Sequence, residues 1–170
     1  LFMNDNEEKQ TATCDDCVLA PKLLTIGENA FTWCEQLNNV NLWNTHRIQA
    51  RAFYNSGIQQ VITRAKIGPA SFCGCSKLEV ACLPSQTKIA PRTFLNCSRL
   101  RLLNIYATDF GPYAFSGCSA LNINFASKSP CFIGPYAFER TILDQVILGD
   151  GSRIASFAFK NTEQHSILGK

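Results

Sequence analysis

The residues of this 170-residue chain that could carry out chemistry are 9 cysteines and 2 histidines. Cys14 and Cys17 have the C-x-x-C spacing of redox and zinc sites, but no second pair at zinc spacing follows and no βαβ pattern surrounds them. We interpret this segment as the end of a degenerate repeat, with a strand beginning at Cys17. His46 and His165 have no aspartate or serine partner that repeats with them, which argues against a Ser-His-Asp or Cys-His site. The sequence therefore predicts no catalytic residue, no metal ligand and no cofactor, in a protein that is not an enzyme.

Four cysteines share one position of an internal repeat: Cys34, Cys75, Cys97 and Cys118. Thiols stacked about 5 Å apart in neighbouring coils could form disulfides or bind metal. A uniform stack gives no reason to pair any two of them, and cysteine packs well as a small buried apolar residue. We interpret the four as packing thiols. Cys73 lies off this position and is the best candidate for an exposed thiol.

The elements that position these residues follow from a repeat marked by seven phenylalanines: Phe31, Phe53, Phe72, Phe94, Phe115, Phe138 and Phe159. An apolar residue stands five positions before each Phe, a small residue directly before it, and a short strand-like segment such as Leu37-x-x-Val40-x-Leu42 follows. A unit of about 21 residues cannot bury a core alone, whereas stacked units can place Phe on Phe. The pattern predicts stacked coils with a parallel sheet whose strands lie about 4.8 Å apart, and with turns at the Gly and Pro residues before each Phe.

Segments such as IGENAFTWCEQLNNVNL and IAPRTFLNCSRLRLLNI resemble the BspA-type leucine-rich repeat, I-G-x-x-A-F-x-x-C-x-x-L-x-x-V-x-L-P, across residues 23–168. The resemblance implies a curved right-handed repeat solenoid, with a parallel β-sheet on its concave face and mostly irregular or short-helical outer segments. It also implies a binding or structural role without enzymatic activity. Many members of this family are adhesive surface proteins of bacteria and protists, which implies the cell surface or an extracellular location, and others are intracellular. We expect an acidic N-terminal segment or cap over residues 1–22 and a repeat domain of seven repeats over residues 23–170.

Charge is distributed unevenly along the chain. Residues 1–35 hold seven acidic and two basic side chains, and residues 36–110 hold nine basic and two acidic ones. Alternation along the strands directs a row of residues outward whose basic members are Arg47, Lys66, Lys88 and Arg153. Together with Arg51 and Arg92, which stand two positions before a phenylalanine, we call them the basic stripe. An acidic protein, an anionic glycan or a phosphate backbone could bind it, and an ordinary solubilising surface would look the same. The tyrosines at 113 and 136 are not interleaved with the basic residues, which disfavours nucleic acid.

The outward positions of the strand-like segments form a second candidate surface, which we call the strand face: Asn39, Asn41, Gln60, Ile62, Leu102, Asn104, Asn122, Gln145 and Ile147. The resemblance places this surface on the concave side. Its mixture of amides and aliphatic side chains suits protein contact better than catalysis, although a solvated sheet would also show it.

Composition and chain ends limit the remaining classes. The chain is 46% hydrophobic and 17% charged, which excludes an intrinsically disordered protein, and it has no run of about 18 apolar residues that could span a membrane. The N-terminal NDNEEKQTAT is polar enough to cap a solenoid, whereas the C-terminal HSILGK is short and not clearly a cap, which favours either truncation or a partner docked on the last coil, as in end-to-end packing. The sequence thus predicts a protein-binding module for recognition or adhesion. The alternative is an intracellular structural or scaffold subunit of a larger protein or ribonucleoprotein assembly.

Overall fold

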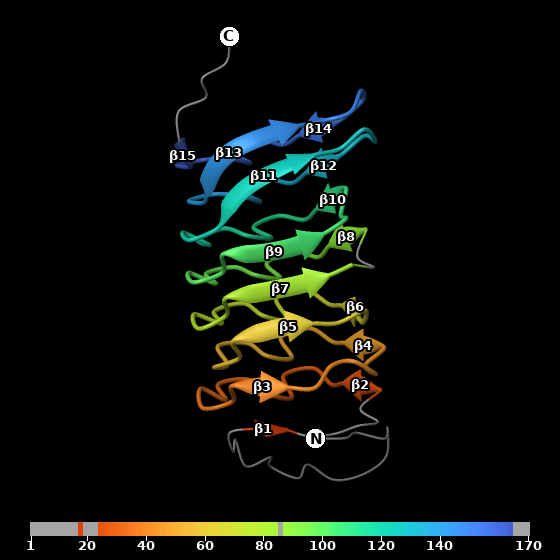
Figure 1. Ribbon diagram of the computed structural model, residues 1–170, viewed down its shortest axis with the longest axis vertical. Coiled ribbons are helices and arrows are strands. Elements are labelled where there is room, and N and C mark those ends of the chain that lie inside the picture. The colour runs from red at the N-terminus through yellow and green to blue at the C-terminus, as the bar shows by residue number, and fades with distance from the viewer. Residues whose placement is uncertain (1–16, 19–23, 85–86, 165–170) are drawn as a thin grey trace.

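The structure is a computed structural model that describes residues 17–18, 24–84 and 87–164, without the side chains of 17, 18 and 164. Within these ranges every regular element is a β-strand, and all strand pairs are parallel. The chain winds through stacked coils, each made of a short strand, a turn arc that carries the phenylalanine, and usually a longer strand (Figure 1). We number the coils 1 to 7 by their phenylalanines, from Phe31 to Phe159. The predicted repeat solenoid is confirmed.

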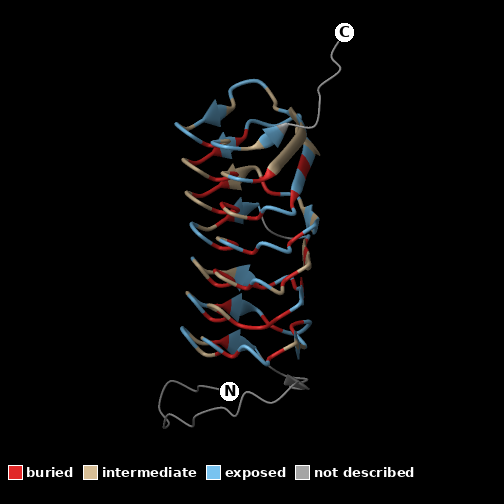
Figure 2. Cartoon of the chain, turned by 90° about the vertical axis from the view of Figure 1, so that its left-hand side faces the viewer, coloured by how far each residue is buried: buried red, intermediate tan, exposed pale blue. Residues whose placement is uncertain are grey.

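The expectations for the chain ends lie largely outside the described residues. These are the acidic N-terminal segment, apart from residues 17–18, and the uncapped C-terminus. Turn arcs, rather than short helices, form the outer segments in the described part of the chain. The coils form a nearly straight column in two perpendicular views, so the strand face is not visibly concave (Figures 1 and 2).

The strands form ladders on two sides of the column. The short strands make two ladders, one of β2 (Thr25–Ile26), β4 (Arg47–Ile48) and β6 (Lys66–Ile67), the other of β8 (Lys88–Ile89), β10 (Asp109–Phe110), β12 (Phe132–Ile133) and β14 (Arg153–Ile154). The remaining strands make three: β1 (Cys17–Val18) with β3 (Asn39–Val40); β5 (Gln60–Ile62), β7 (Val80–Leu83) and β9 (Leu102–Ile105); and β11 (Asn122–Ala126), β13 (Ile142–Ile147) and β15 (Glu163–Gln164).

The seven phenylalanines stack in the core, one ring on the next. Consecutive ring centroids lie 5.1–5.5 Å apart, and the ring planes are within 11° of parallel. Six of the rings are buried, and that of Phe159 in coil 7 is half-buried. Buried residues line the inside of the column and exposed residues its outside (Figure 2). This stack joins the coils into one core because each unit buries its ring against the next.

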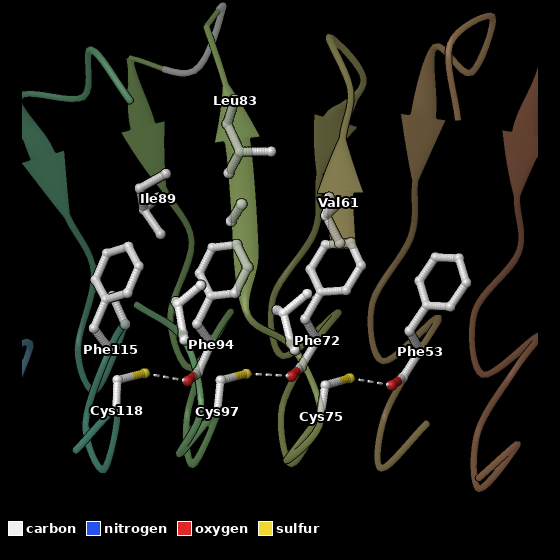
Figure 3. Packing of buried hydrophobic residues seen from close by; sticks show 14 of the residues in the cluster. Phe53, Val61, Phe72, Cys75, Leu83, Ile89, Phe94, Cys97, Phe115 and Cys118 are labelled. Carbon is white, nitrogen blue, oxygen red and sulfur yellow. Dashed lines mark hydrogen bonds between the residues drawn. The ribbon is translucent and has the colours of Figure 1, made fainter. Parts of the chain in front are cut away.

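A row of thiols and hydroxyls runs beside the rings, three positions after each Phe. Cys75, Cys97 and Cys118 are buried, and each thiol donates a hydrogen bond to the carbonyl oxygen of the phenylalanine in the preceding coil, with Sγ···O distances of 2.9–3.0 Å (Figure 3). Thr141 and Thr162 occupy this position in coils 6 and 7, and their hydroxyls donate to the phenylalanine carbonyl of their own coil. The thiols thus link adjacent coils as well as filling space.

Each turn arc contains two residues with positive φ, two positions before and two positions after its phenylalanine. Their φ angles lie between 52° and 75°, and only Gly74 and Gly117 among them are glycines. Hydrogen bonds between coils hold this conformation: in coil 4, the N–H groups of Arg92, Phe94 and Asn96 donate to carbonyls of coil 5 at 2.8–2.9 Å. These bonds offset the usual cost of left-handed backbone in non-glycine residues.

The sheet on the strand side is interrupted between coils 4 and 5. β9 pairs with β7 and β11 pairs with β13, but β9 and β11 do not pair with each other. The same two coils stay joined elsewhere, by the β8–β10 pair and by the hydrogen bonds of their turn arcs. Figure 1 shows β11 diverging from β9 toward the C-terminal ends of the two strands. This interruption, like the one between β3 and β5, is confined to one side of a column whose coils stay joined by the hydrogen bonds of their turn arcs.

Candidate functional site

The nine residues of the strand face all lie exposed on one side of the column. Some of their amides bond to one another from coil to coil: Gln60 Nε2 donates to Asn39 Oδ1 at 3.2 Å. Ile62, Leu102 and Ile147 are 47–58% exposed, although they are aliphatic. The face therefore presents apolar groups between polar ones on a rigid backbone.

A hollow at the N-terminal end of the strand face was missed in the sequence. It has a volume of about 390 Å³ and lies between coils 1 and 2, where Asn41, Trp43, Gln60 and Ile62 line it. The indole of Trp43 is 67% exposed, and the Arg64 guanidinium lies 5.7 Å from its ring centroid. The available signal was that Trp43 follows the strand-like segment of coil 1 at a position that the repeat does not require.

The basic stripe is divided by the structure. Arg47 pairs in register with Lys66 in the first short-strand ladder, whereas Lys88 and Arg153 belong to the second. All four are exposed, but Lys88 Nζ lies 3.1 Å from the Asp109 carboxylate, which partly neutralises the second ladder. Arg47 and Lys66 thus form the strongest positive part of the stripe in the described residues.

The other two members of the basic stripe lie on the turn arcs instead. Arg51 and Arg92 are exposed and occupy the positive-φ position before the phenylalanine in coils 2 and 4. The Arg92 guanidinium lies 5.7 Å from the ring centroid of Tyr113. Both arginines are close enough to Cys73, in the coil between them, to lower its pKa against the stronger opposing effect of burial. Nothing in the described residues joins this pair to Arg47 and Lys66.

Two of the cysteine predictions are wrong. Cys73 is only 7% exposed, because the larger Tyr54 and Leu95 occupy the same repeat position in the coils on either side. Cys82, on β7, is the least buried free thiol of the described residues. Cys34 is disulfide-bonded, so it is not a free packing thiol. The prediction that Cys34 is buried is confirmed, since it is 5% exposed.

The described residues show no grouping that suggests catalysis. They contain no group of three or more His, Cys, Asp or Glu side chains that could hold a metal ion. His46 is exposed, and its backbone N–H donates to Leu24 on the neighbouring coil. His165 and Cys14 lie outside the described residues, as does the side chain of Cys17.

We expect Cys75 and Cys97 to resist alkylation in the folded protein. Burial raises the pKa of Cys75 to about 12, against a weaker opposing effect of the Ser56 hydrogen bond. Burial, together with the neighbouring thiol of Cys118, also raises the pKa of Cys97. Because the thiolate is the reactive form, both should react slowly at neutral pH. Mass spectrometry after iodoacetamide treatment should find Cys82 modified first, and the other two only after guanidinium is added. Equal rates for Cys75 and Cys82 without guanidinium would contradict this assignment.

Comparison with known proteins agrees with this architecture. A family model described as the BspA type leucine-rich repeat region, in 6 copies, matches residues 8–122 and 65–168. A crystal structure of a leucine-rich repeat protein from Bacteroides ovatus is similar, with a TM-score of 0.69 and 23% sequence identity. The similarity covers 77% of this chain and 36% of that one, so it shows the shared fold.

A search of curated proteins found no match. None of the described residues forms a helix long and apolar enough to cross a membrane. Repeat families of this kind are typically non-catalytic and take part in protein interactions. The stacked phenylalanines, the repeated thiol position and the family match together show that this chain belongs to the BspA-type leucine-rich repeat family.

Proposed function

We propose that this chain is a non-enzymatic protein-binding module that recognises its partner through the N-terminal part of the strand face, with the Trp43 hollow as its anchor site. The observation that supports this most strongly is the exposed indole of Trp43, which stands beside exposed Ile62 and Arg64. Tryptophan and arginine dominate the binding energy of protein interfaces, while surrounding contacts exclude water. The amides of Asn41 and Gln60 would serve as that surrounding polar contact.

With respect to the described residues, Trp43 is 67% exposed and contributes little to the core. A large apolar side chain left in water is informative when it lies in a patch with others, and Ile62 extends this patch along β5. A broad face of this kind fits one large partner surface better than a small substrate. Recognition or adhesion is therefore the role that we infer.

The basic stripe supplies a second feature that would select the partner. Arg47 and Lys66 lie side by side in parallel register, and like charges at that distance repel each other. An acidic surface on the partner would relieve this repulsion and speed association. We infer that the partner is acidic where it meets coils 2 and 3.

Replacing Trp43 with alanine should remove most of the binding without unfolding the chain. Trp33 provides the matched control, because it is 62% exposed and lies on the turn arc of coil 1, away from the hollow. A displayed library of protein fragments from the source organism would be selected on the wild-type chain, and the enriched fragments measured by fluorescence anisotropy. We expect Trp43→Ala to weaken them by about 2 kcal/mol or more, and Trp33→Ala to leave them nearly unchanged.

The same fragments would be measured on the Arg47→Glu/Lys66→Glu variant. Weaker binding that depends less on salt would support the acidic partner. Lys88 is left unchanged because a glutamate there would face Asp109 and destabilise the fold. Equal loss with Trp33→Ala and Trp43→Ala, or no enriched fragment at all, would rule out the Trp43 anchor.

A further inference from the structure

The opening between β9 and β11 has a cause in the sequence. In coil 4 the inward-facing residues are Leu100, Leu103 and Ile105, and in coil 5 they are Leu121, Ile123 and Phe125. The spacing between the first two is three positions in coil 4 and only two in coil 5. A shift of one residue moves every side chain of a strand to the opposite face. β11 therefore cannot keep its apolar residues inside and also pair in the register of β9. The register returns in the next coil through an irregularity after Ile123, where β13 holds one extra residue, Asp144.

A cavity of about 340 Å³ lies in this opening. Its floor is buried and apolar and includes Ala107, Phe110 and Ile123. Phe110 stands where each of the other coils has isoleucine, and its ring centroid lies 5.7 Å from that of Phe125 in the wall. The exposed rim carries Tyr106, Asn122, Asn124 and Lys128. An apolar cavity with a polar rim of this size falls within the usual range of binding pockets, about 300–1,000 Å³.

The sides of the opening are the free edges of two strands. Leu102 donates its N–H to Glu79 toward β7, and successive N–H groups of a strand point to opposite edges, so those of Leu103 and Ile105 point toward β11. Likewise Ile142 donates to the Leu121 carbonyl, which leaves the backbone of Asn122 and Asn124 directed toward β9. No strand of the described residues lies against these groups. Few residue pairs of β9 and β11 have Cα atoms within 8 Å of each other, unlike the paired strands β7 and β9 or β11 and β13. Adding a strand between β9 and β11 requires a separation of about 9.6 Å.

We infer that this opening binds an extended peptide, which adds a strand between β9 and β11 and places one bulky apolar side chain in the cavity. Main-chain hydrogen bonds to the two free edges supply affinity, and the cavity supplies selectivity for the inserted side chain. The site lies between coils 4 and 5 and is distinct from the Trp43 hollow between coils 1 and 2. It does not depend on the proposed function of the strand face.

The test uses a displayed library of random linear peptides, selected on the whole chain and measured by fluorescence anisotropy. We expect the enriched peptides to share one bulky apolar residue within a β-forming segment. Ala126 is exposed on the rim, so Ala126→Trp should block the cavity and weaken binding by about tenfold or more. Ala120→Trp is the matched control, since Ala120 is also exposed but does not line the cavity, and it should have little effect.

Backbone recognition is tested separately. N-methylation of single peptide amides should weaken binding in both phases of the alternation, because alternate amides face β9 and β11, and amide hydrogen exchange should slow at Leu103 and Ile105. Binding that is insensitive to N-methylation would indicate an apolar-ligand pocket and overturn strand addition. Peptides that bind Ala126→Trp as well as the wild type, or the absence of any peptide sensitive to that variant, would overturn the site. Trp43→Ala should leave this binding unchanged, so failure here is distinguishable from failure of the strand-face proposal.

Discussion

Replacing Phe94 with alanine is expected to lower the free energy of unfolding by about 3–5 kcal/mol. The ring is fully buried and stacked on both faces, with centroid distances of 5.5 Å to Phe72 and 5.2 Å to Phe115. The substitution removes buried apolar surface and leaves a void that two rigid turn arcs, hydrogen-bonded to each other, cannot close. Guanidinium unfolding followed by circular dichroism would measure the loss.

Phe159→Ala is the control for Phe94→Ala. Phe159 stacks on one neighbour, Phe138, and is only half-buried, so its truncation should cost clearly less. Phe94→Leu, which keeps most of the volume, should cost about 1.5 kcal/mol or less if the core can adjust. Equal losses for Phe94→Ala and Phe159→Ala would show that the ring stack does not carry the stability that its geometry suggests.

Gly57→Ala is expected to destabilise the junction of coils 1 and 2 by about 1–3 kcal/mol or more. A Cβ at Gly57 would lie 2.0 Å from the backbone oxygen of Glu35 and 2.7 Å from its carbonyl carbon. The obstacle is backbone and cannot rotate away, and Gly57 in coil 2 also donates its N–H to the carbonyl oxygen of Cys34 in coil 1 at 2.9 Å. Relief would require the two coils to move apart.

Gly27→Ala is the matched control, because a Cβ there meets no atom of the described residues within 4 Å. It should change the melting temperature little, or raise it slightly by reducing the freedom of the unfolded chain. Gly57→Ala should lower the melting temperature, and the backbone amides of coils 1 and 2 should exchange their hydrogens faster than in the wild type. A Gly57→Ala protein that melts with the wild type would mean that these coils are not held as closely as described.

The sequence was sufficient to predict the stacking of the coils, because the side chains that define the repeat are the same ones that make the contacts between coils. Phe53, Phe72 and Phe94 recur at nearly constant spacing, and a ring in one coil fits only against the ring in the next. Alternation within short strands was equally predictive, since Arg47 points outward and Ile48 inward. These features depend on periodicity alone.

Features that depend on the backbone were not predictable. The positive-φ positions carry residues as different as Asn29, Arg51 and Phe157, because hydrogen bonds between coils impose the conformation and the side chain has little part in it. The salt bridge of Lys88 with Asp109 required knowing that the two are paired in register.

The candidate sites were predicted only in part. Periodicity predicted that the strand-face residues are exposed, but the Trp43 hollow and the opening beside Phe125 arise where the repeat is broken. A single missing residue after Leu121 is visible in the sequence, yet its effect depends on whether the strand slips, bulges or separates. Here β11 separates from β9, and a bulge in β13 restores the register on the other side of β11.

The hydrogen bonds of the turn arcs also give the column a direction. From coil 1 onward, the donors on each arc belong to the earlier coil and the acceptors to the later one, as in Phe53 to Ser71 and Phe72 to Thr93. Unlike the parallel ladders, where bonds run both ways, these peptide dipoles add along the axis. In these backbone bonds the arc of the earlier coil offers N–H groups and the arc of the later coil offers carbonyl oxygens, whereas the thiols of Cys75, Cys97 and Cys118 donate in the opposite direction. Two copies could therefore extend this column head to tail, but two like ends would meet donor against donor or acceptor against acceptor.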